Sequence, residues 1–560
     1  MTRRHFVADN AEAIERGLAG YCALHADRLA LQTDPRYVLR AVPATDKVAL
    51  LSGGGSGHEP LHVGFVGTGM LDAAVPGEVF SSPSAAQVRA ATLAADHGRG
   101  VLHIVKNYTG DVINFRLAAE ACRAAGVDVA TVVVDDDVPS AVRGSVPGRR
   151  GTVATVVVEK ICGAAAEAGL GLSELATLGQ RVVDRARSVG VALTAGTSYS
   201  SDDSAFTLAE GKLEFGVGIH GERGTDRITA EDLPSLVRRC LDLLAADLAD
   251  TGGIVGPQLL LVNGLGATTS LELSAVYGEV AAQLADRGVE LVRAVVDDLV
   301  TSLDMRGVSL TLVRLDDELL RWWDAPCDAP AWRPADARPG VAPRPAPAVT
   351  PTSTAGQESH RVDPRVARWV EGILGVIAAH ADELGELDRR AGDGDFGDNL
   401  RTVAQRCRVT AADGNPLHRL AEACSSIGGT SGPMLAVWFS GIARHLGGAV
   451  IGASDLADGL QAGTDAVREL GGAAPGDRTM VDAMVPAVDA ARRAAGQPEA
   501  TQYLVLEAAR MGAEAAAAST ADLVARRGRA SYVGEAARGT ADPGAVAISL
   551  FLAAGADAWS

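Results

Sequence analysis

The sequence predicts an α/β N-terminal half containing two α/β lobes, joined by a Pro/Ala-rich linker to an all-α C-terminal half. Three observations carry this prediction. Before Asp324, short β-branched runs alternate with alanine-rich amphipathic segments, which is the pattern of βαβ units. After Asp363, apolar residues recur at the spacing of helical faces. The composition between these two residues cannot form a core of its own. We therefore expect domains at residues 1–334 and 360–560, with a linker at 335–359.

Two groups of strands are expected in the N-terminal half. Buried parallel strands are expected at "KVALLS", "GVLHIVKN" and "VDVATVVVDDD", with crossover helices at "SPSAAQVRAATLAADHG" and "INFRLAAEACRAAG". A second group follows the glycine-rich region near Gly216, at "PQLLLVNGLGA", "VELVRAVVDD" and "VSLTLVRLDDEL". The break between the groups is the reason for expecting two lobes.

The C-terminal half shows helical periodicity and no convincing strand. From Val366 onward one apolar face contains Trp369, Val370, Ile373, Val376, Ile377, Leu384 and Leu387. Similar spacing continues in "TMVDAMVPAVDAARRA", "EAARMGAEAAAAST" and "GAVAISLFLAAGADAW".

Composition excludes several classes of function. The net charge of −19 leaves no basic surface for nucleic acid. The seven cysteines are scattered without a CxxC pair, which is typical of reduced thiols in a cytosol. The N-terminus lacks the apolar core of a signal peptide, and the best apolar run is too short to span a membrane. We expect a soluble, cytoplasmic protein.

A glycine-rich stretch, "SGGGSGHEP", follows the first expected parallel strand. Ligands bind at the carboxyl edge of such sheets, where glycines let the backbone approach a small polar molecule. The stretch matches neither the Walker pattern nor a clean dinucleotide fingerprint, so it predicts a small-molecule pocket of another kind. A tight structural turn is the alternative.

Three more loops place ionisable groups after strands. "VKNYTGD" carries Lys106 and Asp111, "VVDDDVPS" carries three acids, and "EFGVGIHGERG" carries His220 between glycines. Each residue alone is ordinarily a solvated loop residue. Together at one sheet edge they favour a site, in which His220 is a base or a nucleophile toward a carbonyl.

Two loops of the helical half fit a nucleotide. "GELDRRAGDGDFGDNL" gathers Asp388, Asp393 and Asp395, and carboxylates are the ligands that Mg²⁺ prefers. The EF-hand spacing is absent, and a solvated acidic turn is the alternative. "SSIGGTSGPML" offers backbone N–H groups and hydroxyls for phosphate at Gly429, Thr430 and Ser431.

These stretches resemble the dihydroxyacetone kinase family. "SGGGSGHEPLHVGFVGTGMLDAAVPGEVFSSPS", "VKNYTGDVINF", "VVVDDDV", "RRGTVATVVVEKICGAAAE" and "FGVGIHGERG" resemble its substrate-binding domain. "LDRRAGDGDFGDNL", "GGTSGPM", "GDRTMVDAM", "RRGRASYVGE" and "DPGAVA" resemble its nucleotide-binding domain, an eight-helix barrel closed around ATP. Because both domains lie in one chain, the resemblance is to the single-chain, ATP-dependent type.

The resemblance implies roles for the first site. Gly55, Lys106 and Asp111 would bind the substrate hydroxyls, and His58 and Asp111 would help to deprotonate the attacking hydroxyl. His220 would bond covalently to the ketone carbon as a hemiaminal, which rejects glycerol because glycerol has no carbonyl.

In the second site, the resemblance implies two magnesium ions held by Asp388, Asp393 and Asp395. Phosphate and nucleotide contacts would come from Asn399, Gly429, Thr430, Ser431, Arg478, Asp542 and Gly544. Three residues depart from the family pattern: Arg478 replaces a more frequent lysine, Phe396 a histidine or cysteine, and Asp398 a small residue.

The expected activity is ATP-dependent phosphorylation of dihydroxyacetone at a terminal hydroxyl by a homodimer. Family members also phosphorylate erythrulose, cyclise FAD as FAD-AMP lyases, or act as regulatory partners without catalysis, and these are the alternatives. The pocket residues named above touch only the shared ketone and terminal hydroxyl, so they leave the length of the ketose open.

Overall fold

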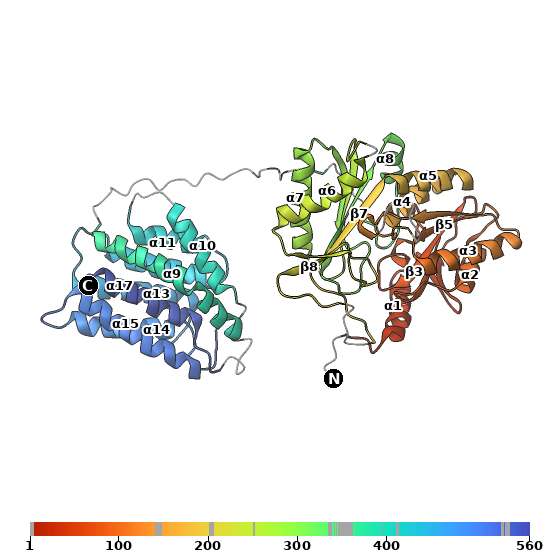
Figure 1. Cartoon of the computed structure of the whole chain (residues 1–560). Helices are drawn as coiled ribbons and strands as arrows, with labels where there is room; N and C mark the ends of the chain where they lie inside the picture. Colours follow the sequence, from red (N-terminus) through yellow and green to blue (C-terminus); the bar gives the residue numbers. More distant parts are fainter. Residues whose placement is uncertain are drawn as a thin grey trace. The chain divides into compact units, whose positions relative to one another are not determined.

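The computed structural model describes residues 5–140, 148–200, 206–249, 252–333, 339–340, 342, 344, 346, 362–392, 394–409, 414–527, 531 and 538–560. The chain forms two compact units, Met1–Pro347 and Ala348–Ser560 (Figure 1). The first unit is α/β, and the described part of the second is entirely helical. The predicted fold class is therefore confirmed. Most of the expected linker at 335–359 lies outside the described residues.

The first sheet has the strand order β1-β2-β4-β3-β5-β6. Strands β4, β3, β5 and β6 are parallel, and the β1–β2 hairpin pairs antiparallel with β4. Its strands are β1 (Leu29–Thr33), β2 (Arg36–Arg40), β3 (Ala49–Ser56), β4 (Ala73–Val79), β5 (Val101–Lys106) and β6 (Val129–Val134). The helices of this lobe are α1 (Asn10–Leu24), α2 (Ala85–Ala95), α3 (Thr109–Ala124), α4 (Ala154–Glu167) and α5 (Leu172–Arg185), with short 3₁₀ turns at Val63–Phe65 and Val138–Ser140.

The second sheet has the order β11-β10-β12-β7-β8-β9 and only one parallel pair, β10 with β11. Its strands are β7 (Ala186–Ala192), β8 (Lys212–Phe215), β9 (Asp226–Thr229), β10 (Gln258–Gly264), β11 (Leu291–Asp297) and β12 (Gly307–Arg314). Helices α6 (Leu233–Asp247) and α7 (Ser270–Asp286) pack on this sheet, whereas α8 (Asp317–Trp323), which follows β12, packs against α4 of the first lobe. The three strands expected after Gly216 are confirmed as β10, β11 and β12.

The second unit contains eight long helices in its described part. They are α9 (Pro364–Ala391), α10 (Phe396–Val409), α11 (Pro416–Ser425), α12 (Ser431–His445), α13 (Ala453–Gly471), α14 (Met480–Ala495), α15 (Gln502–Ser519) and α17 (Pro543–Ala558), with a 3₁₀ turn at Thr520–Asp522. Each long helix packs against the next in this order, and α17 returns to pack against α9. The helices therefore close a ring, as the barrel prediction requires.

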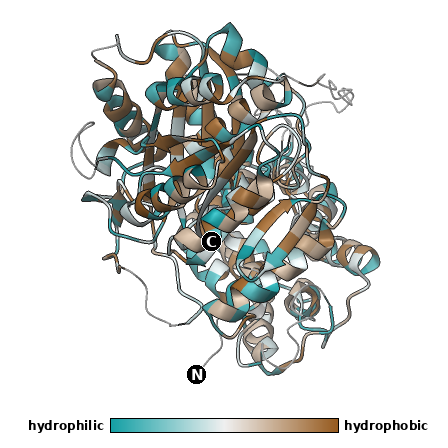
Figure 2. Cartoon of the chain, turned by 90° about the vertical axis from the view of Figure 1, so that its right-hand side faces the viewer, coloured by the Kyte–Doolittle hydropathy of each residue, from teal (hydrophilic) through white to brown (hydrophobic). Residues whose placement is uncertain are grey.

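Buried apolar residues hold each unit together. Figure 2 shows hydrophobic residues in brown along the strands and along the helices. In the second unit the Trp369 indole is fully buried and donates a hydrogen bond of 2.8 Å to the Phe551 carbonyl, which ties α9 to α17.

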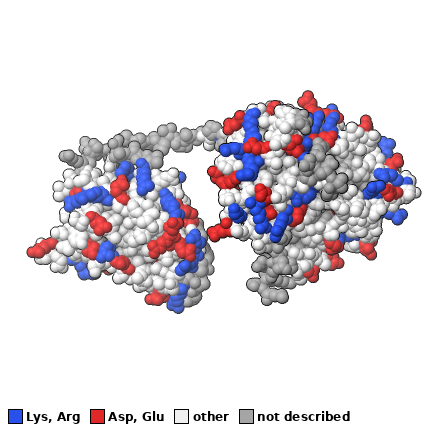
Figure 3. Space-filling view, viewed as in Figure 1, with Lys and Arg blue, Asp and Glu red and all other residues white. Residues whose placement is uncertain are grey.

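The surface is charged with both signs: on the face in Figure 3, acidic and basic side chains are interspersed. Across the described residues, each helix is either too short or too polar to cross a membrane.

Candidate active site

The parallel register of the first sheet gathers the polar residues of the first site. Ser52 of β3 pairs with Ile104 of β5, which brings Lys106 level with Gly54 at the carboxyl edge. A Cβ atom on Gly54 would lie 2.2 Å from the Lys106 Nζ, and one on Gly55 would lie 2.6 Å from the backbone nitrogen of Ser81. In this structure the bare backbone of β3 makes room for a buried ammonium and for the neighbouring segment.

His58 follows β3 and is completely buried. Its Nδ1 atom lies 2.8 Å from the Thr301 carbonyl oxygen. A carbonyl only accepts hydrogen bonds, so Nδ1 carries the proton and Nε2 keeps its lone pair. Nε2 is buried and has no hydrogen-bond partner among the described residues. Burial, together with the charges of His220 and Lys106, holds the pKa of His58 well below its ordinary value.

Lys106 ends β5 and is also completely buried. Its ammonium donates to His62 Nε2 at 2.7 Å and to the Gly53 carbonyl at 3.4 Å. His62 Nδ1 in turn lies 2.7 Å from Oε1 of Glu159, a buried residue of α4. Burial lowers the pKa of Lys106, while the carboxylates of Asp111 and Glu159 raise it.

Asp111 lies in the first turn of α3, where a carboxylate is favoured by the helix dipole. Its Oδ1 atom is buried and, within the described part of the chain, unpartnered. Burial raises the pKa of Asp111, while Lys106 and the Ser82 hydroxyl lower it. Because α3 begins at Thr109, four residues before the expected segment that starts at Ile113, Asp111 is a helix residue rather than a loop residue.

His220 comes from the second sheet, in the loop after β8. Its ring lies 4.8 Å from that of His58 and 4.2 Å from that of Tyr108, measured between centroids. Glu222 accepts a 2.8 Å hydrogen bond from the His220 backbone nitrogen and pairs with Arg150 at 2.9 Å. Burial lowers the pKa of His220 to about 4, so its imidazole is neutral at physiological pH.

The three acids after β6 serve the structure around the site. Asp136 accepts hydrogen bonds from the backbone nitrogen and hydroxyl of Thr152, at 2.6 and 2.7 Å, just before α4. Asp137 pairs with Arg150, and Asp135 has contacts of its own.

Of the residues predicted for the first site, His58, Lys106, Asp111 and His220 are brought together by the fold.

Sequence reasoning passed over two buried residues of this site, His62 and Glu159. Glu159 had a signal, since it and Lys160 are charges within the otherwise largely apolar run "TVVVEKICGAAA". His62 had none, because a lone histidine near a turn residue such as Pro60 carries no functional signal by itself.

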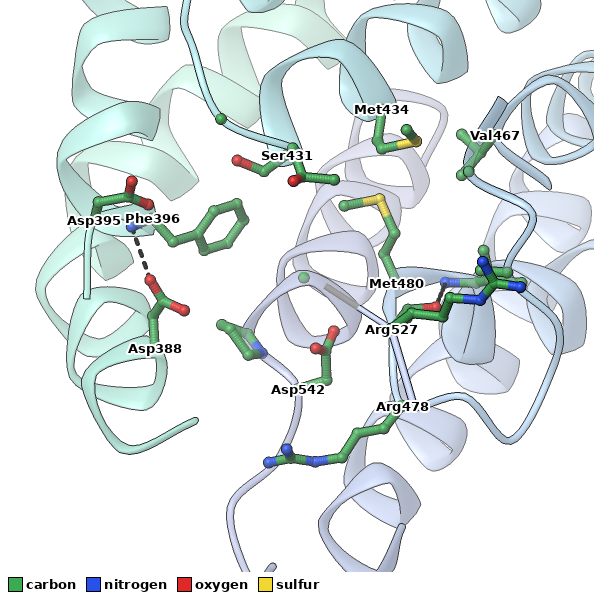
Figure 4. Close-up of a pocket in the computed structure, with 18 residues that line it drawn as sticks. Asp388, Asp395, Phe396, Ser431, Met434, Val467, Arg478, Met480, Arg527 and Asp542 are labelled. Carbon is green, nitrogen blue, oxygen red and sulfur yellow. Dashed lines mark hydrogen bonds between the residues drawn. The ribbon is translucent and has the colours of Figure 1, made fainter. Parts of the chain in front are cut away.

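The second site is a cavity of about 420 Å³ at one end of the helical ring, where α9 and α13 end and α10, α12, α14 and α17 begin (Figure 4). It is lined by Asp388, Asp395, Phe396, Gly429, Thr430, Ser431, Met434, Val467, Gly471, Ala473, Arg478, Thr479, Met480, Val481, Arg527, Asp542, Pro543 and Gly544. Most of the residues predicted for this site line it. Asn399 is outside this group, in the first turn of α10.

Acidic side chains form one side of the cavity. Asp388, near the end of α9, accepts a 3.1 Å hydrogen bond from the backbone nitrogen of Phe396, and Asp395 lies beside it (Figure 4). Asp393 lies outside the described residues. The residues that are described contain no cluster of three metal-binding side chains. Two of the three expected carboxylates thus line the cavity, as hard ligands for Mg²⁺ would.

Asp542 adds a third acid to the cavity wall. It caps α17 by accepting from the Ala545 backbone nitrogen at 2.7 Å. Burial raises its pKa to about 7; Arg478 lowers it, and Asp482 and Asp388 raise it further. A half-buried carboxylate near other carboxylates is stabilised by a bound cation, so this wall fits a divalent metal.

The opposite parts of the cavity fit phosphate and an apolar group. Gly429, with φ +77°, precedes Thr430 and Ser431 at the N-terminus of α12, where unpaired N–H groups attract anions. Met434, Met480 and Val467 provide apolar surface (Figure 4). Arg478 has φ +60° and donates to the Thr540 carbonyl at 2.7 Å.

Phe396 and Asp398, two of the departures from the family pattern, differ in whether they line the cavity. The Phe396 side chain lines the cavity. Asp398 is exposed and pairs with Arg401 at 2.6 Å. The motif "RRGRASYVGE" is described only at Arg526, Arg527 and Ser531, and Arg527 lines the cavity.

Comparisons with known proteins cover both units. A Dak1 domain model matches residues 19–331, and a DAK2 domain model matches residues 390–557. The human triokinase/FMN cyclase is 37% identical, over 99% of this chain and 99% of its own. The L-erythrulose 1-kinase of Mycolicibacterium smegmatis is 39% identical, over 90% of this chain and 91% of its own.

A solved structure matches the whole architecture. It is the dihydroxyacetone kinase of C. freundii in complex with AMP-PNP and Mg²⁺, 30% identical, with a TM-score of 0.62. The match covers 99% of this chain and 100% of the other.

Proposed function

Because the chain belongs to the dihydroxyacetone kinase family and is a short-chain ketose kinase, we propose that it transfers the γ-phosphate of ATP to a terminal hydroxyl of dihydroxyacetone. In this proposal residues 1–334 bind the ketose and residues 360–560 bind ATP with two Mg²⁺ ions. The cofactor assignment is supported by the AMP-PNP and Mg²⁺ in the related structure and by the acidic wall of the cavity.

One observation carries the ketose assignment: His58 Nε2 and Asp111 Oδ1 are buried acceptors that have no hydrogen-bond partner among the described residues. Buried polar atoms are normally satisfied, so two orphaned acceptors that both interact electrostatically with the buried Lys106 ammonium call for a ligand. The ligand must donate two hydrogen bonds and accept one. A short hydroxyketone has this pattern.

His220 is proposed to capture the ketone. Its neutral imidazole nitrogen attacks the carbonyl carbon, the carbonyl oxygen takes up a proton, and the ring loses its own N–H proton, leaving a neutral hemiaminal. The lowered pKa supports this role, because a protonated ring has no lone pair for attack. The bond also holds the terminal hydroxyl in place.

Asp111 and His58 are proposed to accept the proton of the attacking hydroxyl. The raised pKa of Asp111 makes it a stronger base than an ordinary carboxylate. His58 is poised through Nε2, because the Thr301 carbonyl occupies its other nitrogen. Lys106 balances the negative charge that develops on the substrate oxygens, with Gly55 keeping β3 close to the segment at Ser81.

In the helical unit, Asp388, Asp393 and Asp395 would hold the metal ions, which would neutralise charge on the phosphates. Gly429, Thr430 and Ser431 would bind phosphate through the start of α12, with Asn399 and Arg478 as further polar contacts. Asp542 and Gly544 would border the nucleotide. We propose a cytoplasmic homodimer in which the nucleotide unit of one chain serves the ketose unit of its partner.

A four-carbon ketose is the second candidate substrate, because an erythrulose kinase is 39% identical over 90% of this chain. Because a triokinase/FMN cyclase is similar to this chain, cleavage of FAD to a cyclic product is a third activity to be assayed. A purely regulatory role is disfavoured, since the residues proposed for both sites are retained.

The direct test is ATP consumption by the purified protein with Mg²⁺, offered dihydroxyacetone, D- and L-erythrulose, glyceraldehyde and glycerol in parallel. Turnover of a ketose and not of glycerol supports the proposal and names the substrate. Silence with every acceptor, with FAD cleaved to a cyclic product, assigns the cyclase reaction instead. Silence in both assays leaves the regulatory role.

A further inference from the structure

Lys106 is hydrogen-bonded to His62, and His62 to Glu159, and the proposed reaction uses neither His62 nor Glu159. His62 and Glu159 contact no proposed substrate atom, yet both are buried and joined to Lys106 by two hydrogen bonds of 2.7 Å. The Oε2 atom of Glu159 is also buried and has no partner within the described part of the chain. Burying a carboxylate so incompletely satisfied costs stability, which a purely structural role does not explain.

The direction of these hydrogen bonds follows from chemistry. A lysine ammonium has donors only, so His62 Nε2 must accept from it. His62 Nδ1 must then carry the ring proton and donate it to Glu159 Oε1. The three residues form one oriented series from the carboxylate in α4 to the ammonium at the end of β5. Of the three N–H bonds of Lys106, two have acceptors within the described part of the chain, His62 and Gly53.

We propose that Glu159, acting through His62, is a positioning residue that keeps Lys106 charged and directed at the substrate oxygens. The inference rests on the proposed ketose kinase function. Glu159 supports the charge of Lys106 at alkaline pH, where a buried lysine would otherwise lose its proton.

Several titratable groups face Lys106 and enter its pH dependence. Asp111 from α3 and Glu159 from α4 raise the pKa of Lys106, against the lowering by burial. His58, His62 and His220, from the loops after β3 and β8, have lowered pKa values, with burial first among the causes and Lys106 contributing. These rings are neutral at physiological pH. Asp111 and the ionised form of Glu159 are therefore the groups that support the ammonium.

Glu159 exerts its effect mainly at high pH. Burial raises its pKa to about 8, while Lys106 opposes that rise. Below this pH the carboxyl is largely protonated and supports Lys106 weakly. Above it, the ionised carboxylate raises the pKa of Lys106. Removing the carboxylate thus lowers the pKa of Lys106, and the ammonium is lost at lower pH.

The test is Glu159→Gln, which preserves the size and the Oε1 acceptor but cannot ionise. We expect the KM for the ketose to rise about tenfold at pH 9, as for a lost interaction with a charged group, and to change less than about twofold at pH 6.5. The alkaline limb of kcat/KM should move to lower pH by about one unit. The KM for ATP should stay unchanged.

Two further variants separate this role from simple packing. Thr155→Val removes a buried hydroxyl one helical turn earlier in α4, and we expect it to leave both KM values and the pH profile unchanged. His62→Phe breaks the series at its centre, so the ketose KM should rise at both pH values. Adding Glu159→Gln to it should have no further effect at pH 9, because the coupling is already lost.

The outcomes are distinct. A wild-type enzyme without ketose turnover refutes the proposed function, before any variant is made. With an active wild type, an unchanged alkaline limb in Glu159→Gln overturns the inference. So does an equal rise of the ketose KM at pH 6.5 and pH 9 together with a lower melting temperature, because that pattern assigns Glu159 to folding alone.

Discussion

The His58 ring is fixed by the Thr301 carbonyl, whose oxygen lies 2.8 Å from Nδ1. The two residues belong to different lobes, one following β3 and the other in the segment between β11 and β12. This hydrogen bond decides the tautomer of His58 and leaves Nε2 as an acceptor. The proton-accepting geometry of the first site therefore depends on how the two sheets pack together.

Removing the nucleophile should abolish ketose capture. We expect His220→Ala to lose any covalent ketose adduct and to discriminate against glycerol at least about tenfold less than the wild type, because only a carbonyl can bond to the ring. Intact-mass spectrometry with dihydroxyacetone measures the adduct, and parallel kinase assays measure discrimination. The exposed His97→Ala is the control. An adduct that persists in His220→Ala would refute the role.

The adduct should survive mild acid. Because burial lowers the pKa of His220 to about 4, the neutral ring dominates at pH 5.5 as well as at pH 7.5. An ordinary imidazole with a pKa of about 6.5 would lose roughly nine-tenths of its neutral form at pH 5.5. The adduct fraction, measured by mass after equilibration, should be equal at the two pH values. If the adduct fraction instead fell in acid with a midpoint near pH 6.5, the pKa of His220 would not be lowered.

A single methyl group should displace the Lys106 ammonium. In Gly54→Ala the new Cβ would lie 2.2 Å from Nζ, so the ammonium must move. We expect the KM for the ketose to rise by about tenfold or more, with the KM for ATP unchanged, because one charge-assisted contact is lost. The control is Gly278→Ala, which meets open space on α7 and should be neutral or slightly stabilising. An unchanged ketose KM in Gly54→Ala argues against Lys106 as a ligand.

Removing an acid from the cavity should impair phosphate transfer but leave ketose capture intact. Asp388→Asn should lower kcat by about 10²-fold, since one group that stabilises the transition state is weakened, while the ketose adduct still forms in the other unit. Chelation of Mg²⁺ should have the same selective effect. The control is Asp398→Asn, since that residue is exposed and pairs only with Arg401 in the described structure. Loss of adduct and turnover together would indicate misfolding instead.

Asp542 should make the helical unit less stable at high pH. Its folded-state pKa is about 7, above the ordinary value of 3.8, so the folded state binds the proton more tightly and loses stability as the pH rises toward 7. Asp542→Asn keeps the α17 cap and has no charge. Without Mg²⁺, its melting temperature should exceed that of the wild type at pH 8, with a smaller gain at pH 5. The transition that Mg²⁺ and AMP-PNP shift in the wild type identifies this unit.

A matched cap tests the sign of that effect. Asp232 caps α6 at the surface, and its hydrogen bonds with Ser235 hold its pKa below the ordinary value. Asp232→Asn should therefore give no gain in melting temperature at pH 8. A gain at both positions would mean that the stabilisation does not come from relieving a buried charge.

Periodicity and turn chemistry were enough to predict the fold class. The alternation of strands and helices before Asp324 and the helical spacing after Asp363 correspond to the two units. Strands β1, β2, β8 and β9 were missed, because they are only four or five residues long and have no continuous apolar run. Strands β4 and β7 were missed as well, since a Pro-Gly pair interrupts β4, and Arg187 and Gly190 interrupt β7. The antiparallel pairing of β12 could not be predicted from the sequence either, because strand direction depends on the connections between strands rather than on the local residue pattern.

For the sites, the sequence by itself determined which chemistry is present: His58, Lys106, Asp111 and His220 after strands, and the acids near Asp388 before a helix. Only the tertiary structure decided the state of these groups. The His58 tautomer, the neutral ring of His220 and the series from Glu159 to Lys106 arise from burial and from partners distant in the chain. Desolvation and hydrogen bonding act through space, and for that reason no local pattern of residues could predict them.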